Sequence, residues 1–247
     1  MITAVMKKLK SLSVFFPVFN EEANLEVLIT QALRIIPNLA TKYELLIIND
    51  GSTDDSLQIA QKLSKKHKEV KVFTHQKNMG YGEVLKIGIK KSQYEWIFWT
   101  DSDLQFDLAE LATFIQETGK NEAIIGYRKK RVEGFGRLMN AGIFKFYINL
   151  LFRLHVRDID CAFKLFRADL LKKLKLSSGS AFTSAEILYR LKKKGIKFKE
   201  IAVNHYPRLY GQATGANPKV IIKACYEALV TYLNIKFSSL EFKNHAK

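Results

Sequence analysis

The sequence predicts an α/β protein with a mostly parallel central sheet and helices on both faces of that sheet. Short continuous apolar runs, typical of strands buried on both faces, alternate with segments of helical periodicity through the first half of the chain. Glycine, proline and polar cap residues separate these segments. The chain has 247 residues, of which 47% are hydrophobic and 26% charged, so it can bury a large core, and neither disorder nor a fibrous repeat is its main architecture.

The first half contains five predicted strands, over residues 12–18, 44–50, 70–75, 95–103 and 123–127. Helices are expected from residue 21 onward and over residues 54–66, 80–91 and 107–117. We expect Asn20 to cap the first helix and Pro37 to end it. Strands and helices in this alternation indicate parallel strands with right-handed crossovers.

The second half is less regular. Helices are expected over residues 138–154, 168–175, 182–194 and 219–236, strands over 161–167 and 196–208, and loops over 127–137 and 210–218. Neither a repeat nor a linker interrupts the chain. We therefore expect one domain over residues 1–218, followed by a basic, helical C-terminal extension over 219–247.

The positive charge of the chain lies entirely in its second half. The net charge is +16, yet residues 1–120 contain 15 Lys or Arg against 15 Asp or Glu, whereas residues 121–247 contain 25 against 9. A generally basic protein would explain this excess. An anionic partner of the second half, such as a membrane surface, a nucleic acid or a phosphate, would explain it too.

Membrane and compartment signals are few. No apolar run reaches the length of about 18–20 residues that a membrane-spanning helix needs. The apolar stretch near the N-terminus contains Pro17 and continues into Glu21 and Glu22, so a buried strand explains it better than a signal peptide. Cys161 and Cys225 form neither a disulfide framework nor a metal motif, which fits a reduced, cytoplasmic compartment. The very apolar helix 138–154 is either a core helix or an interfacial one.

The apolar run of the fourth predicted strand ends abruptly in carboxylates. Asp101 and Asp103 lie one residue apart and can reach one divalent cation, with Gln105 as a further oxygen donor. The alternative is a turn or a cap before helix 107–117. Because ligands of parallel α/β sheets bind at the carboxyl ends of the strands, the position favours a site.

A third carboxylate, Asp50, ends the second strand and can accept hydrogen bonds from a base or a ribose. The following Gly51 permits close approach of the backbone, and Asp54 or Asp55 is expected to be purely structural. The glycines of the segment 80–91 do not match a dinucleotide fingerprint, and helix packing is the expected role of Gly88.

The second half contributes further candidates. They are Asp158 and Asp160 beside basic residues, Glu186 in the first turn of a helix, the basic loop from Arg128 to Arg137, and Arg208 before a loop containing Thr214. An arginine with neighbouring hydroxyl and backbone donors suits a phosphate. Surface ion pairing and a favourable helix-terminal charge are the alternatives for the acidic residues.

Taken together and in this order, the segments PVFNEEANL, NDGSTDD, the glycine pair before a helix, DSDLQ, DIDCAFKLF and HYPRLYGQATG resemble glycosyltransferase family 2. Within that family they are most similar to the dolichyl- and polyprenyl-phosphate mannosyl- and glucosyltransferases, over residues 12–218. The resemblance implies a GT-A nucleotide-sugar fold, with a nucleotide-binding half over residues 1–126 and an acceptor half over 127–218.

The resemblance also implies roles for individual residues. The nucleotide sugar would be bound by Pro17, Phe19, Glu21, Asp50, Gly80, Asp101 and Ser102; Mg²⁺ or Mn²⁺ by Asp101, Asp103 and Gln105; the acceptor phosphate by Arg128, Arg137, Arg208 and Thr214; catalysis would fall to Asp103, Asp158 and Arg208, with Asp160 and Glu186 as further candidates. Phe19 stands where relatives have Tyr, and Tyr81 where many have Lys.

The expected function is that of an inverting, metal-dependent hexosyltransferase. It would move a hexose from a nucleoside-diphosphate sugar to a polyprenyl phosphate, peripherally bound at the cytoplasmic face of the membrane. A family 2 enzyme with a soluble, glycan or protein acceptor is the alternative. A nucleic-acid-binding protein is disfavoured, because the sequence has no RNP, zinc-finger or helix-turn-helix signature.

Overall fold

The computed structural model describes residues 7–129, 135–211 and 222–234. Seven strands of these residues form one sheet: β1 (Leu9–Val18), β2 (Ala40–Asn49), β3 (Val70–Thr74), β4 (Trp96–Trp99), β5 (Ala123–Arg128), β6 (Lys164–Arg167) and β7 (Lys199–Val203). The strand order is β3-β2-β1-β4-β6-β5-β7. Strand β6 is antiparallel to both of its neighbours and the other pairs are parallel, which confirms the mostly parallel sheet.

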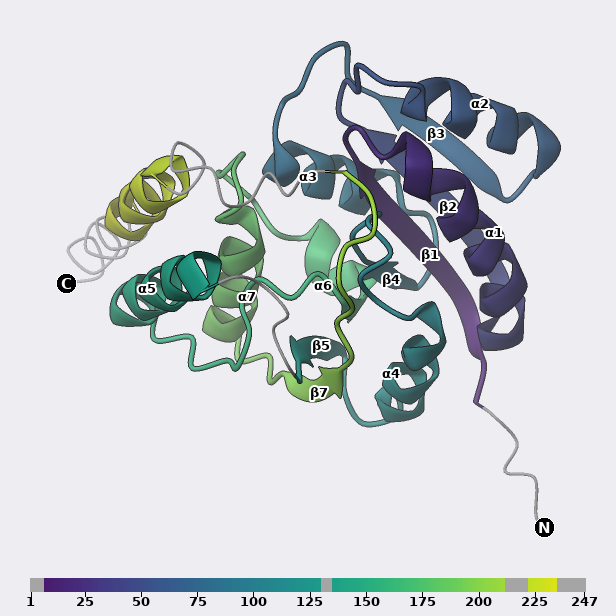
Figure 1. The fold of residues 1–247 in the computed structure, drawn as a ribbon. Helices are drawn as coiled ribbons and strands as arrows, with labels where there is room; N and C mark the ends of the chain where they lie inside the picture. The colour runs from purple at the N-terminus through teal and green to yellow at the C-terminus, as the bar shows by residue number, and fades with distance from the viewer. Residues whose placement is uncertain (1–6, 130–134, 212–221, 235–247) are drawn as a thin grey trace.

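Helices cover both faces of this sheet, as predicted (Figure 1). They are α1 (Glu22–Leu39), α2 (Ser56–Lys66), α3 (Tyr81–Lys91), α4 (Leu111–Glu117) after the short 3₁₀ turn η1 (Leu108–Glu110), α5 (Phe135–Phe152), α6 (Ala168–Lys172), α7 (Thr183–Lys193) and a further helix over residues 222–234. One face packs against α1, α2 and α4. The other packs against α3, α5, α6, α7 and the helix 222–234.

Alternating strand residues fill two hydrophobic cores. In β1, Phe16 belongs to the core under α1, whereas Phe15 belongs to the core under α3. Phe15 stacks on Trp99 of β4 with a centroid distance of 5.4 Å, and Trp99 stacks on Phe166 of β6 at 5.3 Å. Burial on both faces explains why these strands read as continuous apolar runs rather than alternating ones.

Two details of the first helix differ from the prediction. Asn20 does not cap α1: it adopts a positive φ of 56°, and its side-chain oxygen accepts from the Thr53 backbone N–H at 2.8 Å. Asp54 supplies the cap instead, accepting from the Glu22 N–H at 3.1 Å across the gap between the two βα turns. The helix also continues past Pro37 to Leu39, because the Ala40 N–H donates to the Ile36 carbonyl oxygen and closes the turn around the proline.

Several element ends differ from the prediction. Strand β4 stops at Trp99, and β6 and β7 are each shorter than their apolar runs. Helix α5 begins at Phe135 and ends at Phe152, earlier than predicted at both ends, and α6 stops at Lys172. The cause at β4 is pairing: its ladder with β6 covers only four residues, after which the chain leaves the sheet.

The topology gathers both halves of the chain at one edge of the sheet. Strands β1 to β5 and β7 run in the same direction, so their carboxyl ends share that edge. The antiparallel β6 begins there, with Lys164 opposite Trp99. Figure 1 shows the segment after β7, residues 204–211, running across this edge past β4 toward β1.

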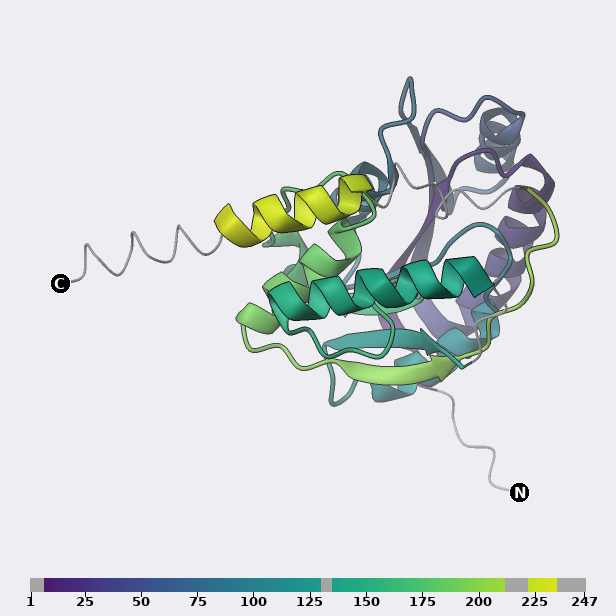
Figure 2. The same cartoon turned by 60° about the vertical axis from the view of Figure 1, so that its left-hand side comes forward.

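The helix 222–234 lies along α5 (Figure 2). The Tyr147 hydroxyl donates to the Cys225 carbonyl oxygen at 3.1 Å, and the rings of Phe152 and Tyr232 meet edge-on at 5.9 Å. In the described part of the chain, no helix combines the length and the apolar character needed to cross a membrane.

Gly88 tests how tightly α3 packs on the sheet. A Cβ at this position would lie 2.5 Å from the Phe15 ring, so Gly88→Ala is expected to destabilise the protein by about 1–3 kcal/mol through overpacking. Gly142 on α5 has open space around its missing Cβ, and Gly142→Ala is expected to stabilise by about 0.5–1 kcal/mol. Chemical denaturation of both variants measures the two effects; equal changes would refute the packing role of Gly88.

Candidate functional site

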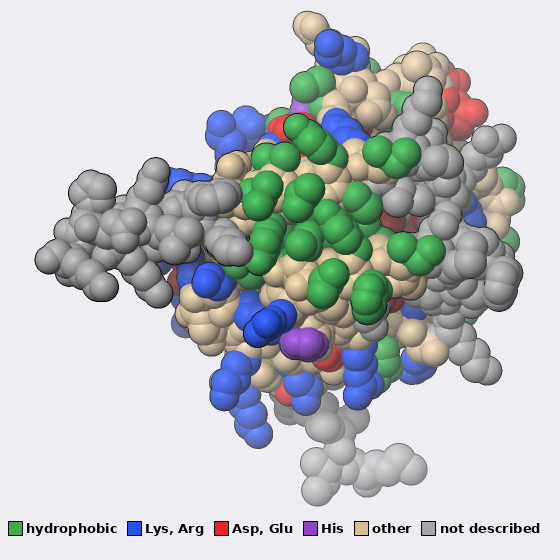
Figure 3. All heavy atoms as spheres, turned by 90° about the vertical axis from the view of Figure 1, so that its left-hand side faces the viewer, with side chains coloured by type: hydrophobic (Ala, Val, Ile, Leu, Met, Phe, Trp, Pro, Cys, Tyr) green, Lys and Arg blue, Asp and Glu red, His purple; other side chains and the backbone are tan. Residues whose placement is uncertain are grey.

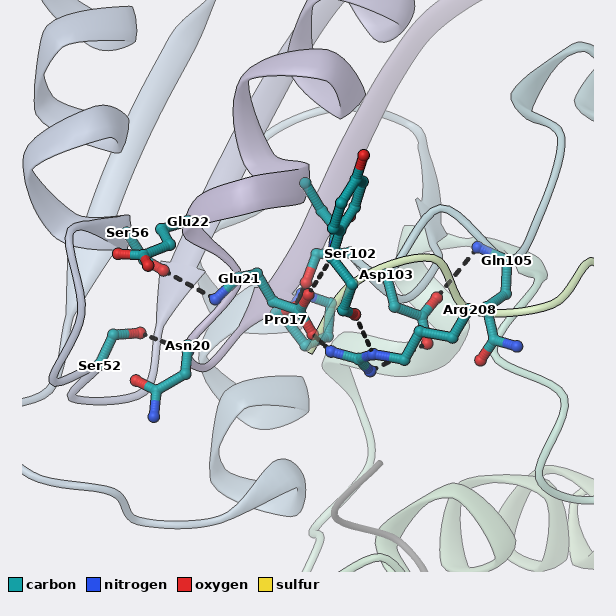
Figure 4. Close-up of polar contacts among 12 residues, drawn as sticks. Pro17, Asn20, Glu21, Glu22, Ser52, Ser56, Ser102, Asp103, Gln105 and Arg208 are labelled. Carbon is teal, nitrogen blue, oxygen red and sulfur yellow. Dashed lines mark hydrogen bonds and ion pairs between the residues drawn. The ribbon is translucent and has the colours of Figure 1, made fainter. Parts of the chain in front are cut away.

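The guanidinium of Arg208 joins the two halves of the chain at the carboxyl edge (Figure 4). Its Nη2 donates to Glu21 Oε1 at 2.5 Å, and its Nη1 lies 3.4 Å from Asp103 Oδ2. Its Nε donates to the Tyr210 carbonyl oxygen at 2.6 Å. Glu21 and Asp103 are largely buried, and burial raises the pKa of Glu21 while Asn24 and Arg208 oppose that rise. One cation therefore serves two buried carboxylates.

The loop after β4 is held in place from both sides. The Ser102 hydroxyl donates to the Pro17 carbonyl oxygen at 2.7 Å, which ties the loop to the end of β1. The Gln105 side-chain amide donates to the Tyr206 carbonyl oxygen at 2.8 Å, and the Tyr206 N–H donates back to the Gln105 carbonyl oxygen at 2.9 Å. The arm that carries Arg208 is thus pinned to the loop that carries Asp103.

Asp101 lies two residues before Asp103 in the same loop, with Tyr81 as a neighbour. Burial and the charge of Asp103 raise the pKa of Asp101 to about 7, although the neighbouring Tyr81 hydroxyl opposes that rise. Burial and the nearby Asp101 in turn raise the pKa of Tyr81 well above its ordinary value, so the phenol stays protonated as a donor. Tyr81, at the position where the resemblance expected Lys, therefore contacts the acidic loop directly.

Two basic residues stand behind these carboxylates. Arg128 forms a two-pronged ion pair with Asp158, with Nε–Oδ2 and Nη2–Oδ1 distances of 2.7 and 2.9 Å, and both side chains are largely buried. Lys164 is buried, and its ammonium donates to the Ile159 carbonyl oxygen at 3.1 Å and to that of Cys161. Burial lowers the pKa of Lys164, whereas the neighbouring acidic groups oppose the shift.

Sequence reasoning did not single out Lys164 as a site residue. The signal was present, because a lysine inside the apolar strand run CAFKLF has to be buried and partnered. Its bonds hold the turn that follows Asp158 at the start of β6. Lys164 is accordingly a positioning residue for that turn.

Asp50 organises the loop before α3. Its Oδ1 accepts from the Met79 N–H at 2.9 Å and lies 2.7 Å from His75 Nδ1, while its Oδ2 accepts from the Gly80 N–H at 2.8 Å. Gly51, with a φ of 68°, allows the Lys77 backbone to pass within 2.5 Å of where a Cβ would stand. The loop 75–80 is therefore seated on the end of β2 by this carboxylate.

Other predicted residues lie elsewhere. Glu186 is fully buried at the start of α7, where it accepts from the Ser177 and Ser178 N–H groups and from Arg190. Asp160 is exposed, in contrast to Asp158. Arg137 lies in α5 without a described side chain, and Thr214 lies outside the described residues. Of the four predicted acceptor-phosphate residues, Arg128 and Arg208 have described side chains, and both lie at the carboxyl edge of the sheet.

The chemistry of this edge fits a divalent cation. Asp101 and Asp103 are close enough for the charge of one to raise the pKa of the other, and a cation would relieve that repulsion. The buried Thr100 hydroxyl, directly before Asp101, has no hydrogen-bond partner among the described residues. The same residues contain no group of three or more metal-binding His, Cys, Asp or Glu side chains, so water and a ligand would complete the coordination.

Comparison with known proteins identifies the family. The family model described as glycosyl transferase family 2 matches residues 13–175, which include Glu21, Asp50, Asp101, Asp103 and Asp158. The chain belongs to glycosyltransferase family 2. The resemblance drawn from the motifs is thereby confirmed.

Two named relatives of this chain have lipid phosphates in their names. A dodecaprenyl-phosphate galacturonate synthase of Rhizobium johnstonii is 26% identical over 231 residues, 92% of this chain and 66% of that protein. A human dolichyl-phosphate beta-glucosyltransferase is 30% identical over 227 residues, 79% of this chain and 67% of that protein. This chain thus spans about two thirds of the length of these two relatives.

Solved structures confirm the GT-A-like fold. Glucosyl-3-phosphoglycerate synthase of Mycobacterium tuberculosis, in complex with Mn²⁺, UDP and glucosyl-3-phosphoglycerate, superposes with a TM-score of 0.71. That match covers 90% of this chain and 80% of the other at 16% identity. Mannosyl-3-phosphoglycerate synthase of Rubrobacter xylanophilus gives a TM-score of 0.68 over 94% of this chain and 75% of the other, at 12% identity.

The seating of the loop 75–80 can be tested at Asp50. Asp50→Asn replaces one acceptor oxygen by a donor that faces N–H groups, and it is expected to cost about 1–3 kcal/mol of unfolding free energy. Hydrogen exchange at the Met79 and Gly80 amides should accelerate. Asp55→Asn is the control, because Asp55 is exposed and its side chain makes no cap bond to α2. Unchanged amide exchange in Asp50→Asn would contradict this role.

Proposed function

We propose that this protein is an inverting hexosyltransferase that moves a sugar from a nucleoside diphosphate to a polyprenyl phosphate. The observation that carries the proposal is the meeting of Glu21, Asp103 and Arg208 at one edge of a GT-A-like sheet. Arg208, which follows β7, there contacts a carboxylate of the loop after β4. The names of the two relatives that use polyprenyl and dolichyl phosphates support this acceptor class.

The donor half would bind the nucleotide sugar along the ends of β1, β2 and β4. Pro17 lies near the end of β1, Phe19 and Glu21 follow that strand, and Asp50 lies beyond the end of β2, where it accepts from the Gly80 N–H. Asp101 and Asp103, with Gln105, would hold Mg²⁺ or Mn²⁺ through oxygen atoms. When bound, such a cation neutralises the charge that develops on the leaving diphosphate.

The acceptor half would position the phosphate that attacks the anomeric carbon. A phosphate is already anionic at neutral pH, so the reaction needs no strong general base. Asp158 would therefore orient a ligand rather than remove a proton. Arg128 holds its carboxylate in place through a two-pronged ion pair. Arg208 would leave its carboxylates for the acceptor phosphate and hold it in line, an effect of positioning.

The acceptor arm also carries exposed apolar groups. Leu209 is 72% exposed and Tyr210 56% exposed, directly after Arg208. A phosphate bound by Arg208 would therefore have apolar side chains beside it, as a lipid phosphate requires. These two exposed apolar side chains support a lipid acceptor over the alternative of a soluble, glycan or protein acceptor.

Nucleotide binding is tested first by thermal shift. UDP, GDP and their common sugar conjugates are each added with Mn²⁺ or with a chelator, and one nucleotide is expected to stabilise the protein only with the metal. A ligand at one hundred times its Kd contributes about 2.7 kcal/mol. Asp103→Asn should abolish the shift, whereas Asp160→Asn, at an exposed site, should keep it. A folded protein that responds to no nucleotide would refute the donor site.

Arg208 is expected to compete with the cation for the carboxylate of Asp103. Arg208→Gln should raise the affinity for Mn²⁺ about tenfold, equal to about 1.4 kcal/mol, because it removes a positive charge 3.4 Å from that carboxylate. Electron paramagnetic resonance of free Mn²⁺ measures the affinity directly. Arg167→Gln, which removes an exposed pair with Asp169, is the control. The same Arg208 variant should lose sugar transfer to polyprenyl phosphate; weaker Mn²⁺ binding would contradict the competition.

A further inference from the structure

The helices α5 and 222–234 present a broad apolar surface on the outside of the molecule. Its members, here called the two-helix face, are Ile143, Phe146 and Leu150 of α5 with Ile222, Tyr226, Leu229, Val230 and Leu233 of the second helix. Figure 3 shows hydrophobic side chains gathered on this side of the molecule, with Lys and Arg side chains along one border. Contiguous exposed apolar surfaces of this kind mark interaction sites.

The two helices are held firmly by their other sides. Phe144, Ile148 and Phe152 point into the core below α5, and Ala224 and Ala228 anchor the second helix in the same core. The outward residues recur at helical spacing, three to four apart, on both helices. Each helix therefore has two apolar sides, one buried in the core and one left without a partner within the described residues.

The charge around the two-helix face favours one kind of partner. Arg153, directly after α5, and Lys223 of the second helix are exposed, and residues 135–157 contain neither Asp nor Glu. The acidic residue of the second helix, Glu227, turns inward and accepts from the Gly179 and Ser180 N–H groups at 3.1 and 3.0 Å. A second copy of the chain would bring two basic borders together, whereas an anionic bilayer would neutralise them.

We infer that the two-helix face is the surface through which this protein lies on an anionic lipid bilayer. The inference rests on the proposed function and adds the residues that meet the lipid. Phe146 and Leu150, 71% and 67% exposed, would enter the boundary between headgroups and acyl chains. The second helix follows in the chain from the arm that bears Arg208, with ten residues between them, so the bound face would keep this arm near its lipid acceptor.

Vesicle co-sedimentation tests the surface. The full chain is expected to sediment with vesicles of phosphatidylcholine and phosphatidylglycerol, and more weakly with phosphatidylcholine alone. The double variant Phe146→Glu, Leu150→Glu should bind at least tenfold more weakly, about 1.4 kcal/mol or more. Both positions are exposed, so the fold should persist, as circular dichroism will show. Val27→Glu, at a 47% exposed position on α1, is the matched control and should bind like the unchanged protein.

Insertion has its own spectroscopic readout. Tryptophan in Phe146→Trp should shift to the blue on anionic vesicles and be quenched by brominated lipid, whereas tryptophan in Val27→Trp should not. The native Trp96 and Trp99 are buried and give a constant background. Failure of the unchanged protein to bind either vesicle, or equal binding by the double variant, would overturn the inference. A dimer that the double variant dissociates, without vesicle binding, would assign the face to a second copy and overturn it too.

Transfer to a short, water-soluble prenyl phosphate separates this inference from the proposed function. The double variant should keep that activity, since its substitutions lie outside the site, and lose transfer to acceptor embedded in vesicles. No transfer to either acceptor by the unchanged protein would refute the proposed function, while its vesicle binding would still support the two-helix face.

Discussion

The pairing of Arg208 with Glu21 and Asp103 connects segments 187 and 105 residues apart in the chain, at N–O distances of 2.5 and 3.4 Å. Both carboxylates are largely buried, and their shared contact with the Arg208 guanidinium holds the arm after β7 over the ends of β1 and β4. The exchanged hydrogen bonds between Gln105 and Tyr206 fix the same arm a second time. The site is thus an electrostatic joint between the two halves of the molecule.

The sheet makes this joint possible. Strand β6 lies between β4 and β5 and is antiparallel to both. It therefore begins at the carboxyl edge, at Lys164, and runs away from it. Arg128, at the end of β5, can therefore grip Asp158 just before β6, and the pair lies beside the acidic loop of the first half. A fully parallel order would begin β6 at the opposite edge and remove Asp158 from the site.

Acidic side chains gather at the carboxyl edge of the sheet, whereas the outer surface of the second half is basic and apolar. Tyr81, Asp101 and Asp103 lie within the edge, whereas the positive charge is concentrated in the second half of the sequence. This division suits a reaction between a nucleotide sugar and an anionic acceptor delivered from a surface. The continuity from Arg208 through residues 212–221 to the helix 222–234 joins the two regions in one stretch of chain.

The sequence alone determined the fold class and the family, and it predicted which carboxylates lie at the ends of the first-half strands. Parallel strands buried on both faces leave a periodic trace, and the carboxylates at their ends, Asp50, Asp101 and Asp103, follow apolar runs directly. Local pattern also predicted Gly88 as a packing glycine, and the Phe15 ring beneath it confirms this.

Only the tertiary structure decided which of these groups meet. The sequence offers Glu186 and Asp158 equally as candidate site residues. In the structure, Glu186 binds the backbone of the loop before α7, whereas Asp158 pairs with Arg128 at the site. The position of Tyr81 beside Asp101 and the burial of Lys164 likewise depend on packing between distant segments. Charge pairing is set by distance in space, and sequence spacing predicts that distance only within one helix or strand.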